Sequence, residues 1–286
     1  MRFRLFRENG ALNSAPVFDA FAKSLDIFSH EENESFEVAV IWSVLWNGRM
    51  AKNKTIWDYC QQNNIPVIVL EVGGINRGTT WKVGINGINR EAYFGEPGNP
   101  SDRAEKFNLK LKPWIEDGEH IIVCGQHDKS HQWRNMPPMS TWVYDTISEL
   151  RKHTDRRIIF RPHPRCRLSG IEHEFKNVIR QEPAQVPNTY DDFDFGVDNA
   201  YAVVNWSSNP ASHAVINGVP VFVGPESLAW PVGNPMLSTI NDPLKPDRTQ
   251  WLNDLAYTEW TIEEIQKGEA LLRLLPKLHE LVLAKK

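Results

Sequence analysis

Two adjacent hydroxyl groups in the second half of the chain could bind an anion. Residues 201–204 form an apolar run that ends in NWSS, and a second apolar run covers residues 219–223 after Gly218. The segment between them is compatible with a short helix, so the pattern predicts strand, turn, helix and strand. The first turn of a helix offers free N–H groups and a positive dipole end, to which Ser207 and Ser208 could add hydroxyl donors. A nucleotide phosphate is the favoured ligand; the alternative is that either serine only caps the helix.

Further polar side chains come directly after other apolar segments. Ligands of open α/β sheets bind beyond the carboxyl ends of the strands, so residues that follow predicted strands are candidates for one site. These candidates are Glu71 after 66–70; Gly125, Gln126, His127 and Ser130 after 120–124; His163 and Arg165 after 157–161; and Glu226 after 219–223. One carboxylate in the first half and phosphate-binding groups in the second suit an enzyme with a base in one half and a nucleotide in the other.

The elements that must position these residues alternate along the chain. Strand-like segments at 36–43 and 66–70 flank a helix-like segment at 54–63, and a glycine-rich stretch at 71–98 predicts loops. A second series has strands at 120–124 and 157–161, a helix at 141–152 and a C-terminal helix from Thr261. Such alternation predicts an α/β protein with parallel sheets, in two Rossmann-like domains that face a cleft. The turn signals in 112–118 place the domains at 1–115 and 116–286, with the last helix free to pack back on the first domain.

Composition limits the class of protein. The chain has 286 residues and a net charge of −4, which excludes a general polycation but not a local basic patch. Three scattered cysteines, Cys60, Cys124 and Cys166, give neither a disulfide framework nor a zinc motif. No apolar run approaches the ~20 residues of a membrane helix, and the N-terminus lacks the long apolar segment of a signal peptide. We therefore expect a cytoplasmic protein without a membrane span.

Three short motifs in order carry a resemblance to a known family. The segments EVGG from Glu71, His163-Pro164 and Ser207-Ser208 resemble the acidic-Gly, HP and SS motifs of bacterial sialyltransferases and capsule-type Kdo transferases. Gly125-Gln126, the phrase ASHAVINGVPVFVGPESLAWP and the segment 260–268 are similar to the capsule-synthesis group. The resemblance covers about 68–274 and implies the GT-B fold and transfer of a sugar from a nucleotide donor, either a UDP- or a CMP-sugar.

The resemblance also implies roles for single residues. Glu71 would be the general base that takes the proton of the acceptor hydroxyl. His163 would stabilise the leaving phosphate, which Ser207 and Ser208 would also bind, so that fixed donors offset its charge without a metal. Nucleotide contacts would come from Gly125, Gln126, Ser130, Arg165 and Glu226. The family's second acidic position is Val72 here, so Asp58 and Glu91 are alternative bases.

Two segments are weighed as metal sites and set aside. Asp192-Phe193-Asp194 matches the DxD pattern that binds metal in the other major glycosyltransferase fold, but its acidic surroundings favour a solvated helix or loop. His127 and His131 flank Asp128 in a turn that is more simply a polar binding loop. No metal is therefore predicted.

The acceptor is open to several interpretations. The loop 76–94 mixes basic and aromatic residues, and Arg77, Lys82 and Arg90 are either a solvated face or a basic rim for an anionic acceptor. Such a rim could grip DNA and hold a flipped base, as in viral enzymes that glycosylate hydroxymethylated pyrimidines. We rank a 5-hydroxymethylpyrimidine base in DNA slightly above a saccharide that receives Kdo or sialic acid. A nucleotide-sugar epimerase or hydrolase and a non-enzymatic binding protein are the remaining alternatives.

Overall fold

The computed structural model describes residues 1–189 and 192–284, which form two compact units. Unit 1 contains Met1–Arg103 and the chain from Asn253 onward, and unit 2 contains Ala104–Leu252. The segment 112–118, expected to cross between domains, lies within unit 2, where the Lys112 N–H donates to the Ile216 carbonyl. The chain from Asn253 onward, with its C-terminal helices, belongs to unit 1, and the last helix was expected to be free to pack there.

Unit 1 is built on a six-stranded sheet in the order β11-β5-β4-β3-β1-β2. Its strands are β1 (Arg2–Leu5), β2 (Glu31–Glu32), β3 (Val38–Trp42), β4 (Val67–Val72), β5 (Trp81–Ile85) and β11 (Glu259–Trp260). The first four strands pair in parallel, whereas β5 runs antiparallel to both β4 and β11. The prediction of a wholly parallel sheet is wrong for unit 1, because β5 forms within the stretch expected to be loop.

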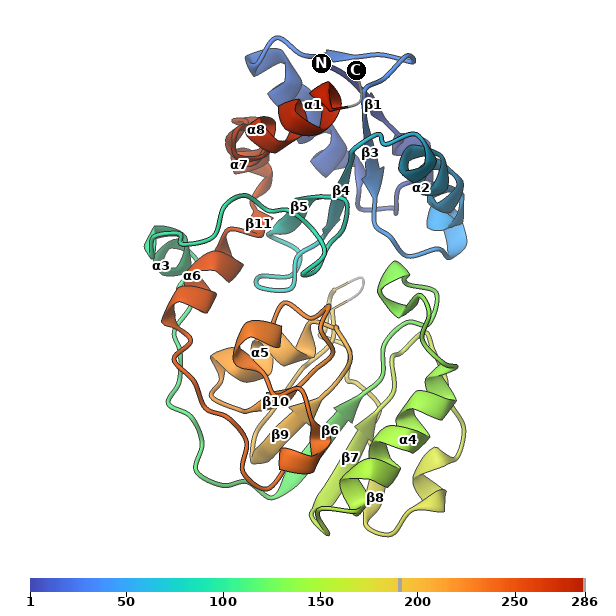
Figure 1. Cartoon of the computed structure of the whole chain (residues 1–286), viewed down its shortest axis with the longest axis vertical. Coiled ribbons are helices and arrows are strands. Elements are labelled where there is room, and N and C mark those ends of the chain that lie inside the picture. Colours follow the sequence, from blue (N-terminus) through green and yellow to red (C-terminus); the bar gives the residue numbers. More distant parts are fainter. Residues whose placement is uncertain (190–191, 285–286) are drawn as a thin grey trace. The chain divides into compact units, whose positions relative to one another are not determined.

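Helices cover both faces of this sheet (Figure 1). The helices of unit 1 are α1 (Ala15–Ile27), α2 (Asn53–Gln62), α7 (Ile262–Gln266) and α8 (Glu269–Leu283), with short 3-10 turns at Arg7–Asn9 and Gly48–Lys52. One core cluster packs Phe18 of α1 and Leu274 of α8 against Trp42 and Leu70. A second cluster packs Trp57 and Cys60 of α2 on the opposite face. Each helix therefore buries its apolar side on the sheet, where burial of a large side chain contributes about 1.5–3 kcal/mol.

Unit 2 has a five-stranded sheet in the order β10-β9-β6-β7-β8, and every pair is parallel. Its strands are β6 (His120–Cys124), β7 (Arg157–Arg161), β8 (Val178–Arg180), β9 (Ala200–Val204) and β10 (Val221–Phe222). Its helices are α4 (Met139–Arg151) and α5 (Pro210–Ile216), with 3-10 turns at His131–Trp133, Ile171–Glu174, Trp230–Val232 and Leu237–Thr239. The strands predicted at 120–124 and 157–161 are confirmed.

Two helices contain the points where the chain passes between the units. They are α3 (Asp102–Lys106) and α6 (Thr249–Ala256). Within unit 1, one Asp254 carboxylate oxygen accepts from the backbone N–H groups of Gly98 and Asn99, both at 2.9 Å. The segments that lead into and out of unit 2 are thus tied to each other inside unit 1. No helix in residues 1–189 and 192–284 has the length and apolar character needed to cross a bilayer.

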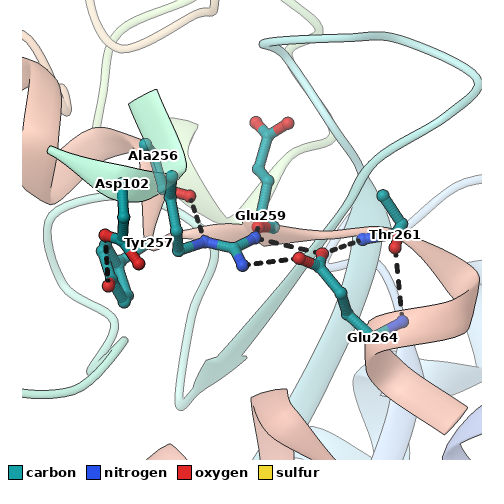
Figure 2. A network of polar contacts seen from close by, with 7 residues as sticks. Asp102, Ala256, Tyr257, Glu259, Thr261 and Glu264 are labelled. Atoms are coloured by element: carbon teal, nitrogen blue, oxygen red, sulfur yellow. Dashed lines mark hydrogen bonds and ion pairs between the residues drawn. The ribbon is translucent and has the colours of Figure 1, made fainter. Parts of the chain in front are cut away.

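A buried ion pair fixes the same region of unit 1. The Arg103 guanidinium donates to Glu264 Oε1 at 2.7 Å and to the Ala256 carbonyl at 3.1 Å, and it lies 3.9 Å from the centre of the Trp260 ring. Figure 2 shows Glu264 turned toward Thr261, whose hydroxyl accepts from the Glu264 N–H while Glu264 Oε2 accepts from the Thr261 N–H. This capping box starts α7, and the Arg103 guanidinium also donates to Glu264 Oε2 at 3.2 Å, so it contacts both carboxylate oxygens.

Replacing Arg103 should destabilise unit 1 strongly. Arg103 and Glu264 are 5% and 3% exposed, so Arg103→Met leaves a buried carboxylate unpaired at a cost of about 3–5 kcal/mol. The double variant Arg103→Met/Glu264→Gln removes that charge, keeps the capping box and should recover much of the loss. Lys54→Ala, which breaks the exposed Lys54–Asp58 pair, is the control and should cost about 0–1 kcal/mol. Urea denaturation measures all three; equal losses for Arg103→Met and Lys54→Ala would contradict the buried pair.

Candidate functional site

The central strands of unit 2 bring the predicted phosphate-binding residues to one edge of the sheet. Strands β9, β6 and β7 are neighbours and parallel, so the residues that follow them lie side by side. The Gly125 N–H donates to the Arg161 carbonyl at 2.9 Å. A Cβ atom at Gly125 would lie 3.3 Å from the His163 backbone nitrogen, so glycine permits the close approach of these two strand ends.

Gln126 links the end of β6 to the end of β9. Its Oε1 atom accepts from the Ser207 N–H at 3.0 Å and from the Ser207 hydroxyl at 3.3 Å. Gln126 is 6% and Ser207 4% exposed. The hydroxyl proton of Ser207 is therefore engaged within the protein, and Gln126 acts here as a buried acceptor that orders the loop after β9.

Ser208 has different surroundings. Helix α5 begins at Pro210 with Asn209 as its N-cap, so neither serine caps it and both lie before its first turn. In the described part of the chain, Ser208 Oγ, Trp206 Nε1 and Asn205 Oδ1 are buried without a hydrogen-bond partner. Buried polar atoms are nearly always paired in folded proteins. Two donors and one acceptor left open within four residues are consistent with a polar ligand at this strand end.

Two histidines meet beside this segment. The His127 and His163 rings are 5.3 Å apart at 62°. His163 Nδ1 accepts from the Arg165 N–H and His127 Nδ1 from the Lys129 N–H, each at 3.1 Å. In its neutral form each imidazole therefore carries its proton on Nε2, the atom that can donate to an oxyanion. Burial lowers the pKa of His127, against the opposing charge of Asp128, which favours the neutral ring.

Three other predicted nucleotide contacts have structural partners. Ser130 caps the 3-10 turn His131–Trp133, since its oxygen accepts from the Gln132 N–H at 3.3 Å. The Glu226 carboxylate pairs with the Arg134 guanidinium at 2.8 Å. Arg165 is exposed and orients His163 through its backbone N–H. Roles for these side chains at a nucleotide stay predictions.

In unit 1, Glu71 lies near the end of β4. Its Oε1 accepts from its neighbour's N–H, that of Val72, at 2.8 Å, and its carboxyl group also hydrogen-bonds the Ser43 hydroxyl. Burial raises the pKa of Glu71, and the opposing contributions come from Ser43, Val72, Lys82 and Arg77. A half-buried carboxylate with a raised pKa suits a general base that works near neutral pH.

The three basic residues of the first half do not share one surface environment. Lys82 is 2% exposed, whereas Arg77 is half-buried and Arg90 exposed. The expectation that Lys82 belongs to a solvated face or an exposed rim is corrected by this burial. Of the alternative bases, Asp58 pairs with Lys54 at 2.6 Å on the surface of α2, and Glu91 Oε1 accepts from the Ile88 N–H at 3.1 Å.

Several residues of the site could not be assigned from the sequence. Ser43 follows β3 with a left-handed φ of 63°, and only the pairing of β3 with β4 brings it to Glu71. His127, three residues after β6, was among the candidates that the sequence placed after the strand 120–124. Trp206 separates Asn205 from the serines, and Gly224 makes room for its indole, since a Cβ there would lie 2.4 Å from the ring. Within residues 1–189 and 192–284 no group of three His, Cys, Asp or Glu side chains could hold a metal ion.

Comparison with solved structures relates this fold to transferases. The chain is similar to Thermosulfurimonas dismutans KpsC, beta Kdo 2,4 transferase, with a TM-score of 0.52 and 12% identity over 98% of this chain and 97% of that one. It also matches Thermosulfurimonas dismutans KpsC, beta Kdo 2,7 transferase, with a TM-score of 0.49 and 14% identity over 100% and 99%. No protein-family model and no curated protein matches the chain. The likeness shows the fold, which is α/β of the GT-B type with two Rossmann-like units.

The two serines should respond differently to removal of their hydroxyl groups. Ser208→Ala deletes a buried oxygen that has no partner in the described residues, so stability should stay the same or rise. Ser207→Ala deletes a bond to Gln126 and should cost about 1 kcal/mol. Thermal unfolding of the two variants beside the parent gives the comparison. A larger loss for Ser208→Ala than for Ser207→Ala would show that Ser208 has a structural role.

Proposed function

We propose that the protein is a metal-independent glycosyltransferase that moves an acidic sugar of the Kdo class from a nucleotide donor to a saccharide hydroxyl. The single observation that carries the proposal is the arrangement of Gln126, His127, His163 and the Asn205–Ser208 segment at adjacent strand ends of unit 2. The similarity of the whole chain to a Kdo transferase of the same fold supports it.

The proposed reaction exchanges one bond at the anomeric carbon. Glu71 takes the proton of the acceptor hydroxyl as the acceptor oxygen attacks that carbon. The bond between the anomeric carbon and the phosphate oxygen breaks, and the nucleotide leaves with the bonding electron pair. The Nε2–H of His163 and the hydroxyl of Ser208 donate to the phosphate oxygens and offset the developing charge. The proton then passes from Glu71 to solvent.

A saccharide acceptor has more support than DNA. The DNA hypothesis was based on the loop 76–94, whose basic residues would grip phosphates and whose aromatic residues would help to hold a flipped base, and one of these basic residues, Lys82, is buried. The net charge of the chain is −4, which gives no general attraction to a polyanion. The structural neighbour named above is a Kdo transferase. We therefore place the saccharide acceptor first, the reverse of the ranking from the sequence alone.

A donor and acceptor panel tests the activity. We expect transfer when the enzyme is incubated with CMP- or UDP-linked sugars and Kdo-containing oligosaccharides, detected as a mass increase of the acceptor. Duplex DNA with 5-hydroxymethylcytosine is included as a second acceptor, and a mass increase there alone would overturn the saccharide assignment. Donor consumption at the same rate without any acceptor would indicate an epimerase or hydrolase instead.

Two variants test the proposed roles of Glu71 as base and of His163 at the phosphate independently. Glu71→Gln should lower kcat by about 10²–10⁴-fold, because the amide cannot take a proton, while the Kd of the nucleotide stays unchanged. His163→Ala should weaken nucleotide binding and lower kcat. His173→Ala changes an imidazole that is 81% exposed and is the matched control. Calorimetric titration with CMP and UDP gives Kd; unchanged turnover in Glu71→Gln would remove Glu71 from the mechanism.

A further inference from the structure

Lys82 lies between two carboxylates in one row across the sheet of unit 1. In the pairing of β4 with β5, Lys82 stands opposite Glu71, and in the pairing of β5 with β11 it stands opposite Glu259. Residues that face each other across antiparallel strands point to the same side of the sheet. Lys82 is 2% and Glu259 1% exposed. A buried lysine is rare unless it is paired, so this row needs an explanation.

Glu259 is the fixed member of the row. One of its oxygens accepts from the Gly74 N–H at 2.6 Å, and the other accepts from the Ile75 N–H at 3.0 Å and the Thr80 hydroxyl at 2.7 Å. Hydrogen bonds to both oxygens hold the Glu259 carboxylate in place, directly opposite Lys82 on the neighbouring strand.

Charged groups around the row act on the pKa of both Lys82 and Glu71. Burial lowers the pKa of Lys82, and Glu259, Glu71 and Glu91 oppose this, while Arg77 acts in the same direction as burial. Lys82 Nζ also donates a hydrogen bond to Asn89 Oδ1 at 3.5 Å. Burial raises the pKa of Glu71, and Lys82 is one of the groups that oppose it. Lys82 thus has a partner on each side, of which only Glu71 has a role in the proposed chemistry.

We propose that Lys82 is a positioning residue that keeps the Glu71 carboxylate ionised and oriented to receive the acceptor proton. This inference rests on the proposed function, since it gives Glu71 the role of base. Glu259 completes the arrangement, because it still compensates the Lys82 ammonium group once Glu71 has become neutral. Lys82 itself touches no reacting atom.

The charge of Glu71 is measured without any substrate. In the full-length protein labelled with ¹³C at glutamate carboxyl groups, Glu71→Gln identifies the Glu71 signal, and its shift is followed against pH. Lys82→Met should raise the pKa of Glu71 by at least about 1 unit, because a nearby opposite charge typically lowers a carboxyl pKa by about 1–3 units. Lys82→Arg keeps the charge and should stay close to the parent. Lys54→Met removes an exposed lysine of unit 1 and is the control for general charge effects.

Turnover gives the second readout. Activity that needs ionised Glu71 is present above its pKa and is lost as pH falls through it. A raised Glu71 pKa in Lys82→Met therefore moves the acidic limb of the kcat/KM profile to higher pH by the same interval. In Lys82→Arg the acidic limb should return to its position in the parent protein. If Lys82→Met fails to fold because Glu259 is left unpaired, Lys82→Met/Glu259→Gln removes both charges, and the amide oxygen can still accept from the 74–75 loop. In that variant the Glu71 pKa should again lie above the parent value.

The outcomes are distinguishable. A raised Glu71 pKa with a displaced acidic limb supports the inference. A Glu71 pKa that does not move in Lys82→Met or in the double variant overturns it, even where stability falls. A raised pKa with an unmoved acidic limb also overturns it, since Lys82 would then act on a residue outside the reaction. No transfer by the parent with any donor would remove the proposed function, while the charge measurement still shows whether Lys82 controls Glu71.

Discussion

The burial of the Glu259 carboxylate is the constraint on which the arrangement around Glu71 and Lys82 in unit 1 depends. This group joins the strand β11, which comes late in the chain, to the loop after Glu71 and to the lysine of the neighbouring strand. The loop fits closely around it, since a Cβ atom at Gly73 would lie 2.4 Å from Glu259 Oε2. Gly73 of the EVGG segment therefore leaves room for the carboxylate that accepts from the N–H groups of Gly74 and Ile75.

Unit 2 differs from unit 1, because all the strand pairs of its sheet are parallel. Its parallel strands leave polar residues at their carboxyl ends, and these residues are partly satisfied by one another. Gln126 and Ser207 are paired, the imidazoles are held by backbone N–H groups, and Ser208 keeps a buried hydroxyl open. In the proposed reaction, donors that are fixed in advance in this way need little reorganisation when charge develops on the leaving phosphate.

The parts of the fold that depend on local pattern were predictable. The strands β6 and β7 are continuous apolar runs with turn signals after them, and Thr261 with Glu264 forms a capping box that marks a helix start. The strand β5 could not be predicted because it contains Lys82 and Gly84. In a sequence a lysine indicates a surface position, and the burial of Lys82 follows only from its partners on β4 and β11. The charged row and the return of the chain to unit 1 depend on pairings between residues far apart in sequence, for which the chain offers no local signal.

The division of the chain also bears on the order of events during synthesis. Unit 2 is one continuous segment, Ala104–Leu252, whereas unit 1 needs residues from both sides of it. A nascent chain leaves the ribosome from its N-terminus, and domains fold as units once their residues have emerged. Unit 2 can therefore complete its sheet while the first hundred or so residues still lack β11. Of the two units, unit 1 begins first along the chain but can be completed only after the residues from Asn253 onward have been made.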